Sequence, residues 1–485
     1  MQIHYLPAAE LARRIRAGEL SASDLLEHCV QRRDQHDDPL NAVVVTDLDR
    51  ARDRARQADA ATARGESWGP LHGVPMTIKE TWEYAGLPTT SGAPGYQQHV
   101  SSKNAISVQR LLDAGAVIWG KTNVPLFAGD LQSYNSIYGQ TSNPWNLERT
   151  CGGSSGGAAV ALATGMTPLE LGSDIGGSIR TPASFCGVFG HKSSYGIIPK
   201  RGHVPGPPGN LTESDISVAG PMARCVDDLE LALDVLTGPA PEEAVAWRLE
   251  LPAARQRRLA DFRVAAWLND PACPVDSETV ELLQGLVDRL RGEGAKVDPE
   301  ARPPGVTLAE SHDIYYSLLT ATMGAGLPEK VYGKMARRAA ELGDDDSYEA
   351  RFARGATQSH AQWLRTHERR LRMAAAWGEL FRTHDVLLAP VTHVPPFPHD
   401  HSNPQYHRHL SVNGQQRPYM DILVWAGLAG VVYLPVTVVP VGVNRDGLPI
   451  GVQVIGPHLE DRTTLAFARE LERLLGGFTP PPGYD

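Results

Sequence analysis

Between residues 70 and 240, short apolar runs alternate with glycine-rich turns and with helices of small residues. The run AGAVIWG at 114–120 is typical of a buried strand, and GGAAVALATG at 156–165 is typical of a short, tightly packed helix. Strands that alternate with helices favour a sheet covered by helices. We therefore expect an α/β fold with a largely central sheet.

The segments on either side of this region differ from it in pattern. Residues 1–65 contain three helical patterns and one short apolar run, so we predict a helical segment that packs on the core. Residues 241–380 end in a long arginine-rich helix, and we interpret them as a variable insertion that covers part of the core and forms the substrate pocket. The core pattern returns at 386–391 with VLLAPV, so we expect residues 66–485 to form one large domain.

Charge and composition exclude several classes of protein. The formal net charge is −10, which argues against nucleic acid or an anionic membrane surface as the main partner. No apolar run approaches the ~20 residues of a membrane helix, and the first residues lack the features of a signal peptide. The five cysteines form no CxxC pair. We expect a cytoplasmic protein without structural disulfides.

Three patterns fit known sites only in part. Residues 115–122 match the phosphate-binding pattern GxxxxGK[ST], but their middle four residues belong to the predicted strand and form no loop of amides. Residues 153–157 match GxSxG, but the preceding segment is polar rather than a strand. A group of histidines among prolines lacks a helical metal motif, so we interpret it as a surface loop: His393, His399, His401, His407 and His409.

Two clusters of small residues carry the candidate chemistry. Ser154 lies in CGGSSGG, and Ser178 lies 24 positions later in SDIGGS. Glycine frees the backbone, so the amides of Ile175, Gly176, Gly177 and Ser178 can point together at a developing oxyanion. Serine needs a base to act as a nucleophile, and without one both clusters would be ordinary turns. Lys79 follows the apolar run GVPMTI, where burial would lower its pKa and make it a base.

Six ordered blocks together resemble the amidase signature family. They are LHGVPMTIKE, GKTNVP, NPWN, CGGSSGGAAVA, GSDIGGSIRTPASFCGVFG and GLPIGVQVIGP. The resemblance implies a mixed, twisted sheet covered by helices and a Ser–cis-Ser–Lys triad of Ser178, Ser154 and Lys79. It makes Ser178 the nucleophile and Ser154, on a cis peptide, the relay to neutral Lys79. It implies no metal or organic cofactor.

The same resemblance suggests roles for neighbouring residues. The family's oxyanion hole maps onto the amides of 175–178, and Ser155, Ser173, Asp174 and Arg180 would support the hydrogen-bond network. Gly129 and Asp130 align with positions near the acyl pocket, and we place Tyr315 and Tyr316 on the leaving-group side. Two departures from the family pattern are Glu80, where aspartate is usual, and Cys151, where proline is common. We expect Cys151 to be a small packing residue.

The expected activity is hydrolysis of a small or medium uncharged amide (aryl, aliphatic or cyclic) or of a carbamate, by a stand-alone enzyme. A homodimer is the expectation at family level. The alternative is the glutaminase component of a tRNA-dependent amidotransferase, although the segment HKSSYGIIPKRGHVPGPPG after the nucleophile lacks the run that is usual there. A binding scaffold without catalysis would not need all three triad residues.

Overall fold

The computed structural model describes residues 2–204 and 206–485. A mixed eight-stranded sheet forms its centre, in the order β12-β11-β13-β17-β16-β9-β10-β8. The bounds of these strands are β8 Leu169–Asp174, β9 Phe189–Lys192, β10 Val218–Ala223, β11 Arg263–Ala266, β12 Lys296–Asp298, β13 Val386–Pro390, β16 Val436–Val443 and β17 Pro449–Ile455. β11 runs parallel to both β12 and β13, and the remaining neighbours are antiparallel. The predicted α/β class is confirmed.

A second sheet of three strands lies beside the first, in the order β1-β3-β2. Its strands are β1 Val43–Thr46, β2 Pro75–Lys79 and β3 Val117–Thr122. β2 runs parallel to β3, whereas β1 is antiparallel to it. The backbone N–H of Thr77 in β2 donates to Thr167 Oγ1 just before β8, at 3.1 Å. The two sheets therefore meet where β2 and the edge strand β8 lie together.

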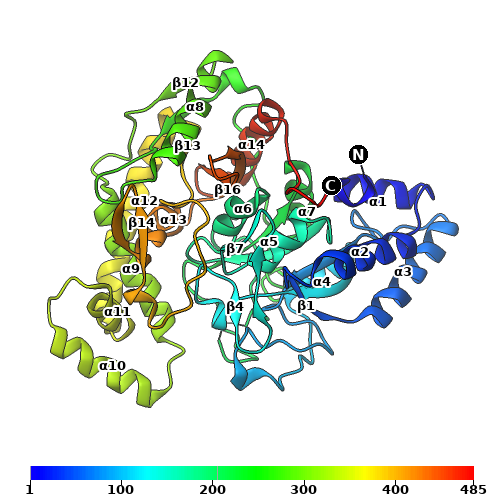
Figure 1. The fold of residues 1–485 in the computed structure, drawn as a ribbon, viewed down its shortest axis with the longest axis horizontal. Coiled ribbons are helices and arrows are strands. Elements are labelled where there is room, and N and C mark those ends of the chain that lie inside the picture. The colour runs from blue at the N-terminus through cyan, green and yellow to red at the C-terminus, as the bar shows by residue number, and fades with distance from the viewer. Residues whose placement is uncertain (1, 205) are drawn as a thin grey trace.

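Short two-stranded ribbons complete the strands: β4 Tyr134–Asn135 with β5 Gly139–Gln140, β6 Ser142–Asn143 with β7 Asn146–Thr150, and β14 His409–Val412 with β15 Gln415–Pro418. The helices are α1 Ala8–Arg16, α2 Ala22–His36, α3 Leu48–Ala63, α4 Ile106–Asp113, α5 Gly156–Ala163, α6 Arg180–Cys186, α7 Val226–Leu236, α8 Ser277–Gly292, α9 Leu308–Gly324, α10 Glu329–Leu342, α11 Tyr348–Ala356, α12 His360–Thr383, α13 Leu423–Gly430 and α14 Asp461–Leu475. The helices α1 to α3 gather on one side of the molecule and α9 to α11 on the opposite side (Figure 1).

Local sequence explains where several helices begin. Ser21 caps α2 by accepting from the N–H of Asp24, and Ser359 forms a capping box with Gln362 at the start of α12. The predicted long arginine-rich helix is α12, which begins only after Ser359, and α11 ends before it. The helices α5 and α13 are buried along their whole length, because their small and apolar side chains face neighbours on every side.

Two features of the predicted domain plan need correction. The segment 1–65 is not only helical, since it also contributes β1 to the three-stranded sheet. Residues 263–298 supply β11 and β12 to the large sheet, so this part of the predicted insertion at 241–380 belongs to the core. A strand of fewer than five residues shows too few alternations of apolar and polar side chains for the sequence to indicate which strand it pairs with.

Candidate active site

Lys79 is the last residue of β2 and is completely buried. Its Nζ donates to Ser154 Oγ at 2.7 Å and to Ser173 Oγ at 2.9 Å. The five residues PMTIK are all buried, so the strand carries the amine away from bulk solvent. The structure thus brings together three residues that the sequence separates widely: Lys79, Ser154 and Ser173.

The electrostatic setting of Lys79 favours the neutral amine. Burial lowers its pKa from 10.5 to about 7, and the nearby carboxyl groups of Asp174 and Glu170 oppose only part of this effect. Desolvation disfavours the ammonium because the charge loses its hydration shell. Near neutral pH a large fraction of Lys79 is therefore free to accept a proton from Ser154.

Ser154 lies at the start of the segment that leads into α5, and the Gly153–Ser154 peptide bond is cis. Gly153 packs so closely on the backbone of residues 130–132 that a Cβ would lie 2.7 Å from the carbonyl oxygen of Asp130. Only glycine fits at this close approach. The next residue, Ser155, donates its N–H to the carbonyl oxygen of Ser178 at 3.0 Å, which joins the two small-residue clusters.

Ser178 lies in the turn between β8 and α6, with 5% of its surface exposed. The amide of Gly177 donates to Asp174 Oδ1 at 2.9 Å, so it is not free as we expected from sequence. Among the described residues, no acceptor faces the amides of Ile175, Gly176 and Ser178. These three N–H groups remain as candidate donors to an oxyanion.

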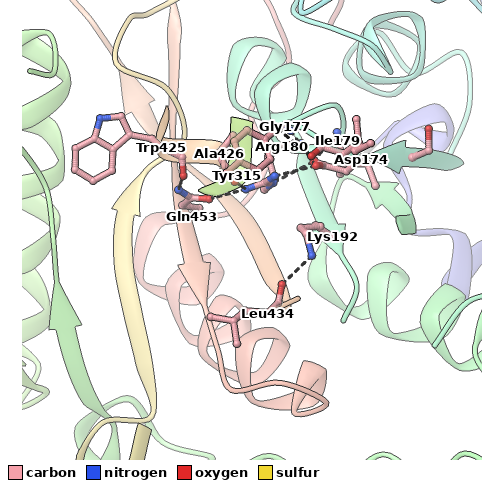
Figure 2. A network of polar contacts seen from close by, with 12 residues as sticks. Asp174, Gly177, Ile179, Arg180, Lys192, Tyr315, Trp425, Ala426, Leu434 and Gln453 are labelled. Atoms are coloured by element: carbon pink, nitrogen blue, oxygen red, sulfur yellow. Dashed lines mark hydrogen bonds and ion pairs between the residues drawn. The ribbon is translucent and has the colours of Figure 1, made fainter. Parts of the chain in front are cut away.

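A buried ion pair holds this turn. Arg180 contacts Asp174 with its Nη2 at 2.8 Å and its Nε at 3.0 Å, and neither side chain is exposed. Burial alone would raise the pKa of Asp174, but Arg180 and the amides of the turn hold it well below its usual range. Arg180 also donates to the carbonyl oxygen of Ala426 and to Gln453, as Figure 2 shows. Asp174 is therefore a fixed anion that accepts from the backbone on both sides of Ser178.

The predicted pocket residues have other partners. Asp130 forms a buried ion pair with Arg408 at 2.7 Å and accepts from the hydroxyl of Tyr419 at 2.5 Å. The carbonyl oxygen of Gly129 accepts from the Gln405 side chain at 3.0 Å. The histidine-rich loop is thereby fastened to the segment that supports Gly153. Sequence reasoning missed Arg408, since a lone arginine in a variable loop gives no signal of its partner.

The two predicted tyrosines differ in their contacts. The hydroxyl of Tyr315 donates to the carbonyl oxygen of Ile175 at 3.1 Å, so it touches the turn before Ser178. Tyr316 packs edge-on against Tyr348, with ring centroids 5.1 Å apart. Its hydroxyl has no hydrogen-bond partner among the described residues.

Glu170 is a second residue that the sequence analysis missed. It lies in β8 and is buried, and burial raises its pKa to about 8, so it is mainly protonated near neutral pH. Its Oε1 has no partner among the described residues, and its charge, when present, acts on Lys79. A glutamate inside the apolar run LELGSD was the available signal, because carboxylates are rarely buried without a role.

The remaining expectations concern the packing of Cys151, a metal site and a membrane-spanning helix. Cys151 is buried in the packing around α5, and burial raises the pKa of its thiol to about 12. Across residues 2–204 and 206–485, the structure groups no three side chains of the types that hold a metal ion. Within those same ranges, no helix combines the length and apolar character needed to cross a bilayer.

The sequence is similar to a family model and to proteins of known activity over almost its whole length. The Amidase family model matches residues 24–465. The A subunit of the glutamyl-tRNA(Gln) amidotransferase of Acidobacterium capsulatum is 32% identical over 485 aligned positions, which cover 95% of this chain and 98% of that protein. Fatty-acid amide hydrolase 2-B of Danio rerio is 29% identical, covering 98% of this chain and 90% of that protein.

Among solved structures, a bacterial aryl acylamidase of the amidase signature family superposes with a TM-score of 0.81. It is 25% identical, and the match covers 99% of this chain and 98% of that one. Fold and relatives together define a hydrolase that acts on carbon–nitrogen bonds in amides. The chain belongs to the amidase signature family.

Proposed function

We propose that this enzyme hydrolyses a small or medium uncharged amide through an acyl-enzyme on Ser178. The observation that supports this most directly is the 2.7 Å hydrogen bond between Lys79 and Ser154, formed by an amine whose pKa burial lowers to about 7. A base of this kind can draw a proton through Ser154 from the nucleophile.

In the proposed acylation step, Ser178 Oγ attacks the amide carbon and forms a C–O bond. Its proton passes to Ser154 Oγ, and the proton of Ser154 passes to Lys79 Nζ. The carbonyl oxygen becomes an oxyanion that accepts from the free amides of the 175–178 turn. When the C–N bond breaks, the same relay returns the proton from Lys79 to the leaving amine.

Deacylation uses the same groups, with water in place of Ser178 as the nucleophile and Ser178 as the leaving group. A water attacks the ester carbon while its proton travels through Ser154 to Lys79. Collapse of the second tetrahedral intermediate releases the acid and returns a proton to Ser178 Oγ. The cycle consumes one water for each amide and leaves the enzyme unchanged.

The substrate proposal rests on relatives and on the chemistry of the relay. The similar aryl acylamidase and the similar fatty-acid amide hydrolase are both named for amide substrates. The relay needs only a carbonyl attached to nitrogen, so a carbamate would react by the same steps. We propose a soluble small molecule as substrate, acted on in the cytoplasm by a homodimer.

A second candidate is the glutaminase component of a tRNA-dependent amidotransferase. It is favoured by the 32% identity to the amidotransferase protein of Acidobacterium capsulatum over nearly the whole of both chains. The same triad would then release ammonia from glutamine for a partner protein. Purified protein that hydrolyses glutamine only in the presence of such partners would select this candidate.

The deciding experiment compares the wild type with Ser178→Ala on a panel of aryl, aliphatic and cyclic amides, carbamates and glutamine. We expect turnover of at least one amide by the wild type, an acyl adduct on Ser178 by intact mass, and neither with Ser178→Ala. Ser311→Ala is the matched control, since Ser311 is buried and its hydroxyl has no partner among the described residues. Undiminished turnover by Ser178→Ala would overturn the proposal.

A further inference from the structure

Tyr315 approaches the turn before the nucleophile from α9. Its side chain is completely buried, and its hydroxyl donates to the carbonyl oxygen of Ile175 at 3.1 Å. The contact is so close that a Cβ on Gly176 would lie 2.7 Å from this hydroxyl. A Cβ on Gly427 of α13 would lie 2.5 Å from Cδ1 of the ring. The hydroxyl of Tyr315 thus packs against one glycine and its ring carbons against another.

The bond from Tyr315 fixes the direction of one peptide unit. A trans peptide is planar, and its C=O and N–H point to opposite sides. Because the carbonyl of Ile175 points toward Tyr315, the N–H of Gly176 points away from it. No acceptor among the described residues faces that N–H. It is therefore available to a substrate oxygen.

This peptide unit needs an external restraint. Gly176 and Gly177 are consecutive, and Gly177 has a φ of +104°, so the backbone has little steric preference of its own. Asp174 fixes the next unit by accepting from the N–H of Gly177 at 2.9 Å. Within the described chain, Tyr315 provides the hydrogen bond to the Ile175 carbonyl.

We propose that Tyr315 is a positioning residue of the oxyanion hole, whose hydroxyl keeps the Ile175–Gly176 peptide turned so that the Gly176 N–H faces the reacting carbonyl. The inference rests on the proposed function and deepens it. It replaces the expectation that Tyr315 lines the leaving-group side. Burial also raises the pKa of Tyr315 well above its ordinary value, so the hydroxyl stays a donor throughout the working pH range.

A tyrosine outside the proposed site supplies the control. Tyr315→Phe removes the hydrogen bond to Ile175 while keeping the ring. Tyr5→Phe makes the same chemical change at a buried tyrosine whose hydroxyl also donates to a backbone carbonyl oxygen, that of Tyr484, at 2.5 Å. A loss shared by both variants would reflect packing, whereas a loss confined to Tyr315→Phe would reflect the hydrogen bond.

The test measures kcat and KM for both variants on the best amide of the panel. We expect Tyr315→Phe to lower kcat by about 10²-fold, near the loss seen when one oxyanion donor is removed, with KM changed less than about twofold. Binding of a trifluoromethyl ketone, whose adduct with Ser178 carries an oxyanion, should weaken in parallel. Tyr5→Phe should keep near wild-type values of all three quantities.

Equal losses in both variants, or a raised KM with unchanged kcat in Tyr315→Phe, would overturn the inference. If the wild type hydrolyses no amide, the proposed function fails, and the inference is then tested by the rate at which a fluorophosphonate labels Ser178. That reaction also develops charge on an oxygen in the hole. Slower labelling of Tyr315→Phe alone would support the inference, and equal rates in the wild type and both variants would reject it.

Discussion

Replacing Lys79 by methionine separates the proposed catalytic role of the amine from its effect on stability. The pKa of Lys79 is about 7 in the folded protein and 10.5 in an unfolded chain. The native state therefore binds fewer protons than the unfolded state between these pH values, and stability at this site rises with pH across that window. The penalty for burying the amine is complete below pH 7 and absent above pH 10.5.

The size of the effect follows from the gap between the two pKa values. A gap of about 3.5 corresponds to about 5 kcal/mol at 1.36 kcal/mol for each pH unit. Methionine fills a similar volume without a charge, so the variant has no such penalty. The difference in free energy of unfolding, variant minus wild type, should fall by about 2.5 kcal/mol between pH 7.5 and pH 9.5. The hydroxyls of Ser154 and Ser173 lose a partner, but that loss does not depend on pH.

Urea unfolding followed by tryptophan fluorescence at the two pH values measures this difference, and hydrolysis measured in parallel should be abolished. Lys121→Met is the matched control, because Lys121 is also buried and its pKa is lowered to about 8. For Lys121→Met, the pH range over which the stability difference changes should begin about one pH unit higher than for Lys79→Met. The Lys121→Met variant also keeps the proposed triad intact. A stability difference for Lys79→Met that does not change with pH would refute a neutral buried amine.

Three further outcomes follow from the charges around the site. With chemistry rate-limiting, kcat/KM should rise through an inflection near pH 7 as Lys79 loses its proton, and a flat profile from pH 5.5 to 8.5 would contradict a lysine base. Glu170→Gln should leave this inflection nearly unchanged, because burial keeps Glu170 mainly protonated near pH 7 and a neutral carboxyl exerts little charge on Lys79; a marked shift to lower pH would show that Glu170 is ionised there. Iodoacetamide at pH 7.5 should leave activity and the mass at Cys151 unchanged, since burial raises the pKa of that thiol to about 12; rapid alkylation there would show that the site opens.

The sequence predicts those parts of the site that depend on contiguous residues. The alternation of apolar runs and glycine-rich turns indicates the α/β class, and the two serine clusters and Lys79 mark residues that the fold brings together. The resemblance to a family added the roles of the serines. The fold class and the burial of Lys79 could be predicted because each depends on a local run whose own residues indicate it, whereas the roles of the serines stay a prediction.

What the sequence could not predict depends on contacts between distant segments. Whether the Gly177 amide is free depends on the direction of the Asp174 side chain, and the partner of Asp130 lies 278 positions away in a variable loop. The same holds for Tyr315, whose ring position is set by packing between α9 and α13. These polar side chains contact their partners only in the packed tertiary structure. The spacing of residues along the sequence therefore does not indicate which groups will pair.

The position of the proposed triad at the seam between two sheets has a consequence for how activity arises during folding. Lys79 ends a strand of the three-stranded sheet, whereas the turn with Ser178 follows the edge strand of the eight-stranded sheet. A chain in which only one sheet has formed would hold either the proposed nucleophile without its base or the base without its nucleophile. Hydrolysis by the proposed triad would therefore report on the docking of the two sheets, and a partly folded chain would be inactive until that step is complete.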